Sequence, residues 1–140
     1  MNFRLSKKRH IRLGHRGETL ACRLLKEKNY DILCRNYKVK SGEIDIVARD
    51  GGVLVFVEVK TMHYRPLARP AANLRFHQKQ RIVRAAGNYL RAIGNPEVPF
   101  RFDLVELVLS SWRIHAIRHW PGHFSSKDLR DPQFRNFDYT

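Results

Sequence analysis

The sequence has few cysteines, few acidic residues and no long hydrophobic run. Its two cysteines, Cys22 and Cys34, are too few for a disulfide framework and lack the paired spacing of a zinc site. No segment approaches the roughly 20 apolar residues that cross a bilayer. The basic N-terminus is not followed by the apolar stretch of a secretion signal. We therefore expect a protein of the reduced cytoplasm, without a membrane partner.

The scarcity of acidic residues leaves a strongly basic chain. Thirteen Asp and Glu stand against 27 Lys and Arg, which gives a net charge of +14. Residues 1–17 and 60–96 each contain no acid, so the charge is concentrated in two stretches. Membrane-surface proteins usually carry such charge on an amphipathic helix or beside a lipid anchor, and neither is evident here. The charge therefore favours a nucleic-acid partner.

The length of 140 residues, of which 43% are hydrophobic, suits one packed core. We predict a basic N-terminal arm over residues 1–13, one folded domain over residues 14–123, and a polar, loosely ordered tail over residues 124–140.

Hydrophobic periodicity predicts two helices and five strands. The helices are expected at residues 14–28 and 75–90, and the strands at residues 30–39, 43–49, 53–61, 100–109 and 112–117. The order is helix, three strands, helix, two strands. It predicts an α/β fold in which helices pack on a single mixed sheet.

Two of the strands, residues 43–49 and 53–61, are joined by the turn sequence Asp50-Gly51-Gly52, which is a strong hairpin signal. A two-residue turn at Gly51-Gly52 pairs residues whose numbers sum to 103. If the turn lay one residue earlier, each residue would face a partner two positions earlier in the opposite strand, and the same side chains would still share a face.

This register gathers charged side chains at one end of the hairpin. Asp45 lies opposite Glu58 and Glu43 opposite Lys60, with directly opposed Cβ atoms about 4.5–5.5 Å apart. Facing carboxylates repel each other and are costly to bury unless a positive charge lies between them. One interpretation is a metal site. The other is a salt-bridge network in which Lys60 pairs with Glu43 and Glu58 at a solvated strand end.

The metal interpretation specifies an ion and a chemistry. Magnesium prefers oxygen ligands and keeps several waters. Asp45, Glu58 and the backbone carbonyl of Val59 could therefore form a site that stays open to a phosphate. Lys60 could orient or deprotonate a water molecule and stabilise negative charge on the phosphate oxygens.

Glu18 is a fourth candidate acid. Together with Ala21, Cys22 and Leu25 it forms one face of the first helix, so its carboxylate lies on or beside the apolar stripe. The alternative is an acid that stabilises the helix dipole near the helix start.

Lys79 in the second helix could contact a phosphate, or could simply be a solvated lysine. The other basic candidates for contacts to a nucleic-acid backbone are Arg16, Arg75 and Arg81.

Taken in order, the motifs resemble those of the YraN-type family of uncharacterised bacterial proteins. The resemblance runs from Gly14 to Ile117 and rests on Gly17-Glu18, Arg35-Asn36, Gly42-Glu43-Ile44-Asp45, the segment from Val55 to Lys60, Lys79, Ala85-Ala86, Tyr89-Leu90 and Arg101-Phe102-Asp103. Thr61-Met62-His63 departs from the basic residue often found soon after the lysine. That family is similar to the restriction-endonuclease-like superfamily, which has an αβββαβ core, and within it to archaeal Holliday-junction resolvases.

The resemblance implies that Asp45, Glu58 and Lys60 are metal-binding and catalytic positions and that Glu18 completes the site. It gives Glu43 a supporting place, where it would orient Lys60 or the metal waters. The implied activity is cleavage of phosphodiester bonds in structured DNA, branched DNA included, with Mg²⁺ as cofactor, Mn²⁺ as its substitute and a homodimer as the active form. Two other functions stay open: a nucleic-acid-binding protein that keeps the fold without cutting, and a partner-binding factor in DNA processing.

Overall fold

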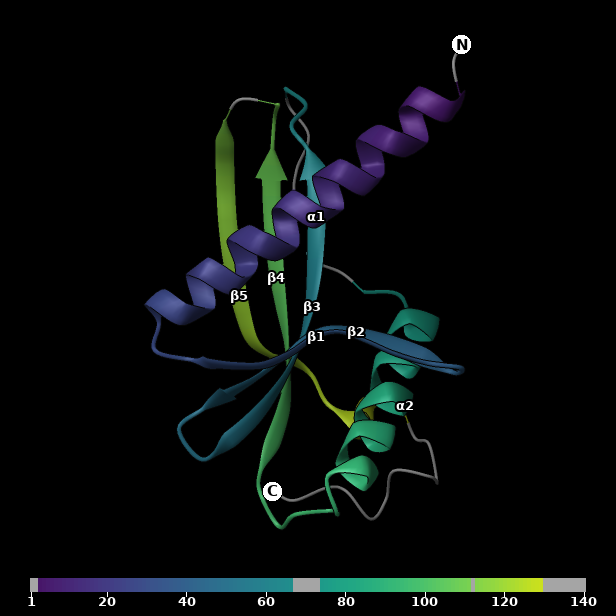
Figure 1. The fold of residues 1–140 in the computed structure, drawn as a ribbon, viewed down its shortest axis with the longest axis vertical. Helices are drawn as coiled ribbons and strands as arrows, with labels where there is room; N and C mark the ends of the chain where they lie inside the picture. Colours follow the sequence, from purple (N-terminus) through teal and green to yellow (C-terminus); the bar gives the residue numbers. More distant parts are fainter. Residues whose placement is uncertain (1–2, 67–73, 112, 130–140) are drawn as a thin grey trace.

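A five-stranded sheet forms the centre of the computed structural model, and one helix packs on each of its faces (Figure 1). The structure describes residues 3–66, 74–111 and 113–129. Its elements are α1 (Phe3–Glu27), β1 (Asp31–Val39), β2 (Gly42–Asp50), β3 (Val53–His63), α2 (Phe76–Ala92), β4 (Phe100–Leu109), β5 (Ile114–Phe124) and a 3₁₀ turn (Ser126–Leu129).

The strands lie side by side in sequence order, from β1 to β5. Strands β3 and β4 are parallel and are connected through α2, whereas the other neighbouring pairs are antiparallel. A parallel connection needs a crossover of this kind. The mixed sheet and the element order confirm the predicted αβββαβ arrangement.

The β2–β3 hairpin has the register that the two-residue turn predicts. Asp50 pairs with Val53 and Ile46 with Val57, so the paired residue numbers sum to 103. Gly51 has φ of 57°, a left-handed conformation that glycine adopts without the steric cost of a Cβ.

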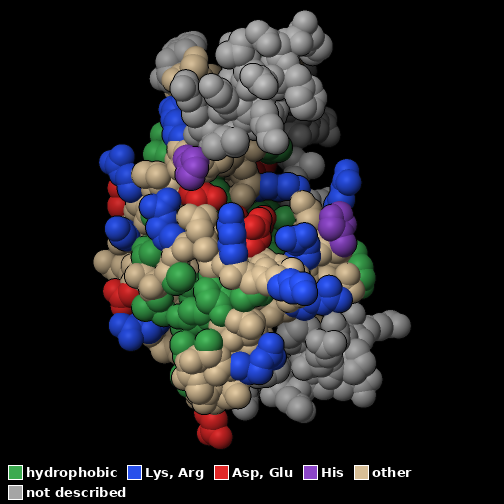
Figure 2. All heavy atoms as spheres, turned by 45° about the vertical axis from the view of Figure 1, so that its right-hand side comes forward, with side chains coloured by type: hydrophobic (Ala, Val, Ile, Leu, Met, Phe, Trp, Pro, Cys, Tyr) green, Lys and Arg blue, Asp and Glu red, His purple; other side chains and the backbone are tan. Residues whose placement is uncertain are grey.

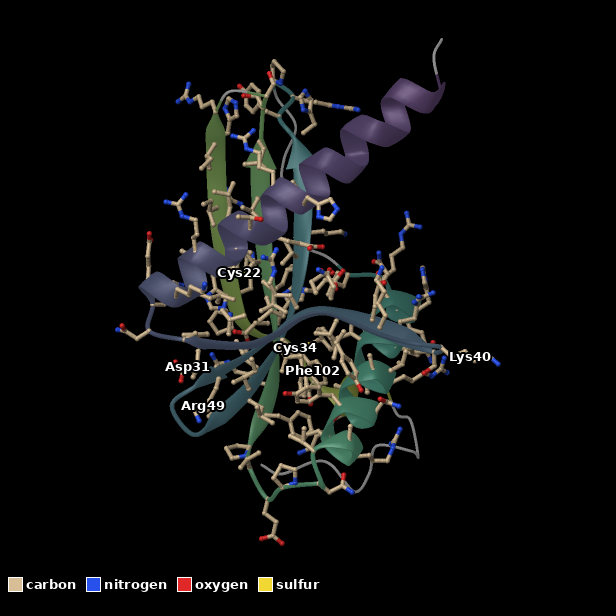
Figure 3. All side chains as sticks on the ribbon, viewed as in Figure 1. Cys22, Asp31, Cys34, Lys40, Arg49 and Phe102 are labelled. Atoms are coloured by element: carbon tan, nitrogen blue, oxygen red, sulfur yellow. The ribbon has the colours of Figure 1, made fainter. Side chains whose placement is uncertain are left out.

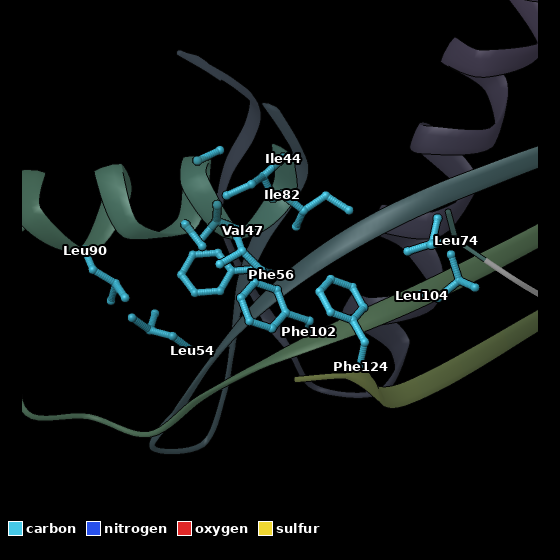
Figure 4. Packing of buried hydrophobic residues seen from close by; sticks show 13 residues of the cluster. Ile44, Val47, Leu54, Phe56, Leu74, Ile82, Leu90, Phe102, Leu104 and Phe124 are labelled. Atoms are coloured by element: carbon cyan, nitrogen blue, oxygen red, sulfur yellow. The ribbon is translucent and has the colours of Figure 1, made fainter. Parts of the chain in front are cut away.

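Strand β3 is buried on both faces, as its continuous apolar run predicts. Phe56 faces α2 and packs with Val47, Phe102 and Phe124 in the larger core cluster (Figure 4). Val57, on the opposite face, packs with α1 residues in the second cluster. The two faces of β3 therefore anchor both helices, which fixes the positions of side chains further along the strand.

Helix α1 begins at Phe3 rather than at residue 14, so the helix continues through the stretch predicted as a basic arm. Residues 3–13 contain neither proline nor glycine, and nothing in the backbone chemistry ends the helix there. The N-terminal part of α1 projects beyond the sheet (Figure 1).

Strand β5 continues to Phe124, beyond the predicted end at residue 117. Pro121 and Gly122 indicate a strand end in the sequence, but β5 is an edge strand, where proline is tolerated. Phe124, where the loosely ordered tail was predicted to start, is buried against Phe102 with ring centroids 4.8 Å apart. Residues 130–140 of that tail lie outside the described residues.

Both cysteines are free thiols (Figure 3). Cys22 is a buried residue of α1 that packs against the sheet, and Cys34 lies on β1. The same view shows Asp31 and Arg49, which form an exposed ion pair of 2.7 Å between β1 and β2. Within the described ranges, no helix is long and apolar enough to cross a membrane.

Candidate active site

The hairpin strands separate at the position where the sequence places its facing carboxylates. The β2–β3 ladder ends at Ile46 and Val57, one position before Asp45 and Glu58. Beyond it, the backbone N–H of Val59 donates to Oδ2 of Asp45 at 2.7 Å. A side-chain oxygen thus replaces the backbone acceptor that a continued ladder would supply. Asp45 and Glu58 therefore lie where the two strands are no longer paired with each other.

The carboxyl groups of Asp45 and Glu58 share a hydrogen bond. Burial raises the pKa of Asp45 to about 6, although the N–H of Val59 and the bond to Glu58 oppose the shift. Burial, followed by the negative charge of Asp45, raises the pKa of Glu58 to about 9. Two acids held this close cannot both ionise at low cost, so near neutral pH they retain a proton between them.

Lys60 and Glu43 lie around this pair with opposite effects. The positive charge of Lys60 lowers the pKa of Glu58, whereas the charge of Glu43 raises the pKa of both Asp45 and Glu58. Glu43 is exposed. Because the ladder ends at Ile46, the predicted cross-strand pair of Glu43 and Lys60 does not form as a ladder pair. The close pair of carboxyl groups, with the charges of Lys60 and Glu43 acting on it, is the main feature of the site.

Gly17 brings α1 against β3 beside the site. A Cβ atom at this position would lie 1.9 Å from Oγ1 of Thr61, so only glycine allows this approach. The neighbouring Glu18 is near enough for its charge to raise the pKa of Asp45. Its Oε2 atom is buried without a hydrogen-bond partner among the described residues. Glu18 therefore lies near enough to Asp45 to interact with it and has one buried oxygen that is unsatisfied among the described residues.

Glu106 is a site residue that the sequence analysis missed. It pairs with Lys60 in the parallel β3–β4 ladder, is 1% exposed, and has no hydrogen-bond partner for either carboxylate oxygen within the described part of the chain. In the sequence it lies within an apolar strand, and only the β3–β4 register reveals its neighbour. An unsatisfied buried carboxylate requires a physical explanation, such as an ion or ordered water.

Helix α2 contributes cationic groups from the other side. The ammonium group of Lys79 lies 5.6 Å from the centre of the Phe124 ring. Burial, and then the charges of Lys79 and Lys60, lower the pKa of His123. His123 is thus a second residue that the sequence analysis did not select, because it lies in a segment interpreted as the end of the fold.

The remaining basic candidates lie apart from one another. Arg16 donates through Nη1 to the backbone carbonyl of Ser110, which ties α1 to the β4–β5 turn. Arg75 and Arg81 are exposed on α2, and the backbone carbonyl of Arg81 would lie 1.9 Å from a Cβ at Gly42. Figure 2 shows a face on which carboxylates are flanked by Lys and Arg side chains. A phosphate approaching this face would meet positive charge around an acidic centre.

The donor set fits a hard divalent cation. The available donors are the carboxylate oxygens of Asp45, Glu58 and Glu18. Asp45 and Glu58 share a proton, and Oε2 of Glu18 is unsatisfied among the described residues. Within the described residues, no three His, Cys, Asp or Glu side chains lie together as a group that could hold a metal ion. Magnesium does not need one, since it is commonly bound by one or two carboxylates, water and substrate phosphate. The residues therefore suit Mg²⁺ or Mn²⁺ better than zinc, which prefers nitrogen and sulfur ligands.

Comparison with known proteins places the chain in a family. The model of the uncharacterised protein family UPF0102 matches residues 17–107. The chain belongs to the UPF0102 family. Two similar members are UPF0102 protein STH1475 of Symbiobacterium thermophilum, 44% identical over 69% of this chain and 81% of its own, and a UPF0102 protein of Chlorobaculum parvum, 41% identical over 77% and 84%. The matched range contains Glu18, Asp45, Glu58, Lys60 and Glu106, whereas Arg16 and His123 lie outside it.

Proposed function

We propose that this UPF0102 protein is a Mg²⁺-dependent endonuclease that cleaves phosphodiester bonds in structured DNA. The observation that carries the proposal is the buried, proton-sharing pair of Asp45 and Glu58 beside Lys60. A pair of this kind is destabilising in a purely structural role, because each carboxylate raises the cost of ionising the other. If a divalent cation took the place of the shared proton, both carboxylates could ionise and that cost would be removed.

The proposed roles follow from the surroundings of each group. Asp45 and Glu58, with the Val59 carbonyl, would hold the cation, and Glu18 would hold water at its unsatisfied oxygen. When bound, Mg²⁺ supplies Lewis-acid stabilisation of negative charge on the phosphate. Lys60 would orient the attacking water and stabilise the phosphate oxygens as the water oxygen bonds to phosphorus and the leaving oxygen departs. Lys79 would hold a neighbouring phosphate, with Arg75 and Arg81 further along the backbone.

A second candidate function is DNA binding without cleavage. It is supported by the shared hydrogen bond itself, since Asp45 and Glu58 can satisfy each other with a proton and no cation. The net charge of +14 would serve either function. The presence of Glu18 and Lys60 at the same place favours catalysis, because neither is needed to hold the proton-sharing pair.

The test is a cleavage assay on branched, flapped and linear DNA, with Mg²⁺, with Mn²⁺ and with EDTA. The wild-type chain should be compared with Asp45→Asn and Lys60→Ala, and with Glu97→Gln as a control at an exposed acid in the loop between α2 and β4. We expect metal-dependent cutting that falls at least about 100-fold in the first two variants and is retained in the control.

Two outcomes would contradict the proposal. Cutting that persists unchanged in Asp45→Asn and Lys60→Ala would show that the activity arises elsewhere. Tight, salt-sensitive binding to every substrate without cutting in either metal would favour the binding-only function. Light scattering with and without branched DNA tests the proposed homodimer, since coordinated cutting of two strands needs two sites.

A further inference from the structure

Two aromatic rings stack at the end of the sheet beyond the candidate active site. Tyr64, directly after β3, and His115, near the start of β5, have ring centroids 3.7 Å apart and planes within 5° of parallel. They are separated by 51 residues in the sequence and do not lie on neighbouring strands. Such a close parallel pair presents a flat aromatic surface.

The backbone and side-chain bonds around the pair hold it in place. The N–H of Tyr64 donates to the carbonyl of Leu109 at 2.8 Å. The His115 Nε2 atom lies 3.1 Å from Oγ of Ser110, the residue whose carbonyl also accepts the bond from Arg16. The two rings are thus fixed by α1, β4 and the β4–β5 turn, and little conformational entropy would be lost when a ligand stacks on them.

The pair is open to solvent and lies among cationic groups. Tyr64 is 42% exposed, although a tyrosine stacked inside a core would be covered. His63 and Arg113 are close enough for their charges to act on His115. Slight burial, together with those charges, lowers the pKa of His115, which favours its neutral ring near neutral pH. An exposed aromatic surface beside positively charged side chains such as Arg113 is the arrangement with which proteins bind unpaired nucleotides.

The position of the pair relates it to the candidate active site. Lys60 and Tyr64 lie on the same chain segment, four residues apart, which corresponds to about 13 Å along an extended strand. A DNA strand whose phosphate lies at Lys60 could therefore reach Tyr64 within a few nucleotides.

We propose that Tyr64 and His115 form a stacking platform for an unpaired base of the DNA, a few nucleotides from the phosphate at the active site. This inference rests on the proposed function and gives it a substrate class: DNA with a single-stranded segment beside the cut. A base within a duplex is covered by its neighbours and cannot stack on the platform, whereas an unpaired base exposes its whole face.

The test combines a protein change with a DNA change. Binding of a flapped DNA is measured in EDTA, with an intact flap and with flaps in which one nucleotide at a time is abasic. We expect one or two abasic positions to weaken wild-type binding about 5- to 150-fold, as loss of one stacked base does. The same abasic positions should have little effect in Tyr64→Leu, and the full effect should remain in Tyr64→Phe.

Trp120→Leu is the matched control, because Trp120 is similarly exposed, at 41%, and lies five residues from His115 along β5. It should retain the abasic effect. An equal abasic effect in wild type and in Tyr64→Leu, with thermal melting showing that the variant is folded, would overturn the platform. Base-dependent binding without cleavage would overturn the endonuclease proposal alone, and cleavage that ignores every abasic position would overturn the platform alone.

Discussion

Asp45 and Glu58 share a hydrogen bond at the point where β2 separates from β3, with the N–H of Val59 bonded to Asp45 at 2.7 Å. The separation replaces a backbone ladder with an acidic pair in the middle of a rigid sheet. A site built on strands holds its groups more precisely than one on loops. The cost is a fold whose stability depends on what neutralises these two acids.

The first prediction concerns pH in the absence of metal. The folded-state pKa values of Asp45 and Glu58, about 6 and about 9, lie above the ordinary values of 3.8 and 4.5. The folded state therefore holds protons that the unfolded state has already lost, and stability should fall as pH rises from about 4 to about 9. Thermal melting in EDTA should show the melting temperature decreasing over this window.

Added Mg²⁺ should reverse the decrease most strongly at pH 8–9, because a cation that binds only the folded state stabilises it. The magnesium-induced rise in melting temperature should then be smallest at pH 5, where protons compete for the same carboxylates. A magnesium effect that is independent of pH would argue against binding at Asp45 and Glu58.

The second prediction separates stability from activity. Glu58 must hold a proton in the folded state at pH 8, whereas the neutral amide of Glu58→Gln needs none. The variant should therefore raise the free energy of unfolding in EDTA at pH 8 by about 1–2 kcal/mol, while it abolishes cleavage and the magnesium-induced stabilisation. Denaturant unfolding provides the measurement. Glu97→Gln, at an exposed position, should change neither quantity. A Glu58→Gln variant that is less stable than wild type in EDTA would contradict the electrostatic account.

The third prediction concerns the contact that brings Glu18 to the site. Gly17→Ala places a Cβ 1.9 Å from Oγ1 of Thr61, which forces α1 away from β3. We expect a loss of about 1–3 kcal/mol in the free energy of unfolding, and a larger fractional loss of cleavage than of DNA binding.

Gly14→Ala is the control for this change, since no atom lies within 4 Å of a Cβ at that position. It should be stabilising, because alanine is favoured over glycine inside a helix by about 1 kcal/mol. Thr61→Ala removes the closest clashing atom and should restore part of what Gly17→Ala loses. Equal effects of the two glycine substitutions would contradict the close-approach argument.

The fourth prediction concerns a structural ion network on the opposite face of the sheet from α2. Asp103 is fully buried and accepts hydrogen bonds from Arg101 at 3.0 Å, His119 at 2.8 Å and the N–H of Gly122 at 2.9 Å. Burial alone would raise the pKa of Asp103, but these bonds lower it below its ordinary value. Its contribution to stability is therefore present above pH 3.8 and is lost as pH falls through the lowered pKa.

Asp103→Ala removes the acceptor of His119 and of the Gly122 N–H and one of the two acidic partners of Arg101, which keeps Asp50, and should cost about 3–5 kcal/mol in chemical denaturation. The matched control is Asp31→Ala, which removes an exposed ion pair with Arg49 and should cost less than about 1 kcal/mol. Similar costs for the two variants would show that the buried network is not stabilising.

The sequence predicted the local features well. The Gly51-Gly52 turn and the alternation on either side of it were enough to specify the hairpin register, and hence the proximity of Asp45 and Glu58. Hydrophobic periodicity predicted the element order for the same reason, since it depends on which side chains must leave water. The predicted start of α1 was wrong because residues 3–13 contain no proline or glycine that would end a helix. The predicted end of β5 was wrong because an end signal such as Pro121 is tolerated on an edge strand.

The contributions from distant segments could not be derived in this way. Glu106 becomes a neighbour of Lys60 only through the parallel register of β3 and β4, and a parallel strand brings no turn from which to count. The stack of Tyr64 on His115 likewise depends on how the sheet ends are aligned.

By itself, the amino-acid sequence determined a basic α/β chain of helix, three strands, helix and two strands, with two carboxylates facing each other across a hairpin, because charge, periodicity and turn chemistry are local properties. Only the tertiary structure decided that the strands separate there, that Gly17 lets α1 approach β3 beside Glu18, and that the buried Glu106 has no hydrogen-bond partner among the described residues. The physical reason is that burial and electrostatic coupling depend on the packing of elements far apart in the chain, which no spacing along the sequence encodes.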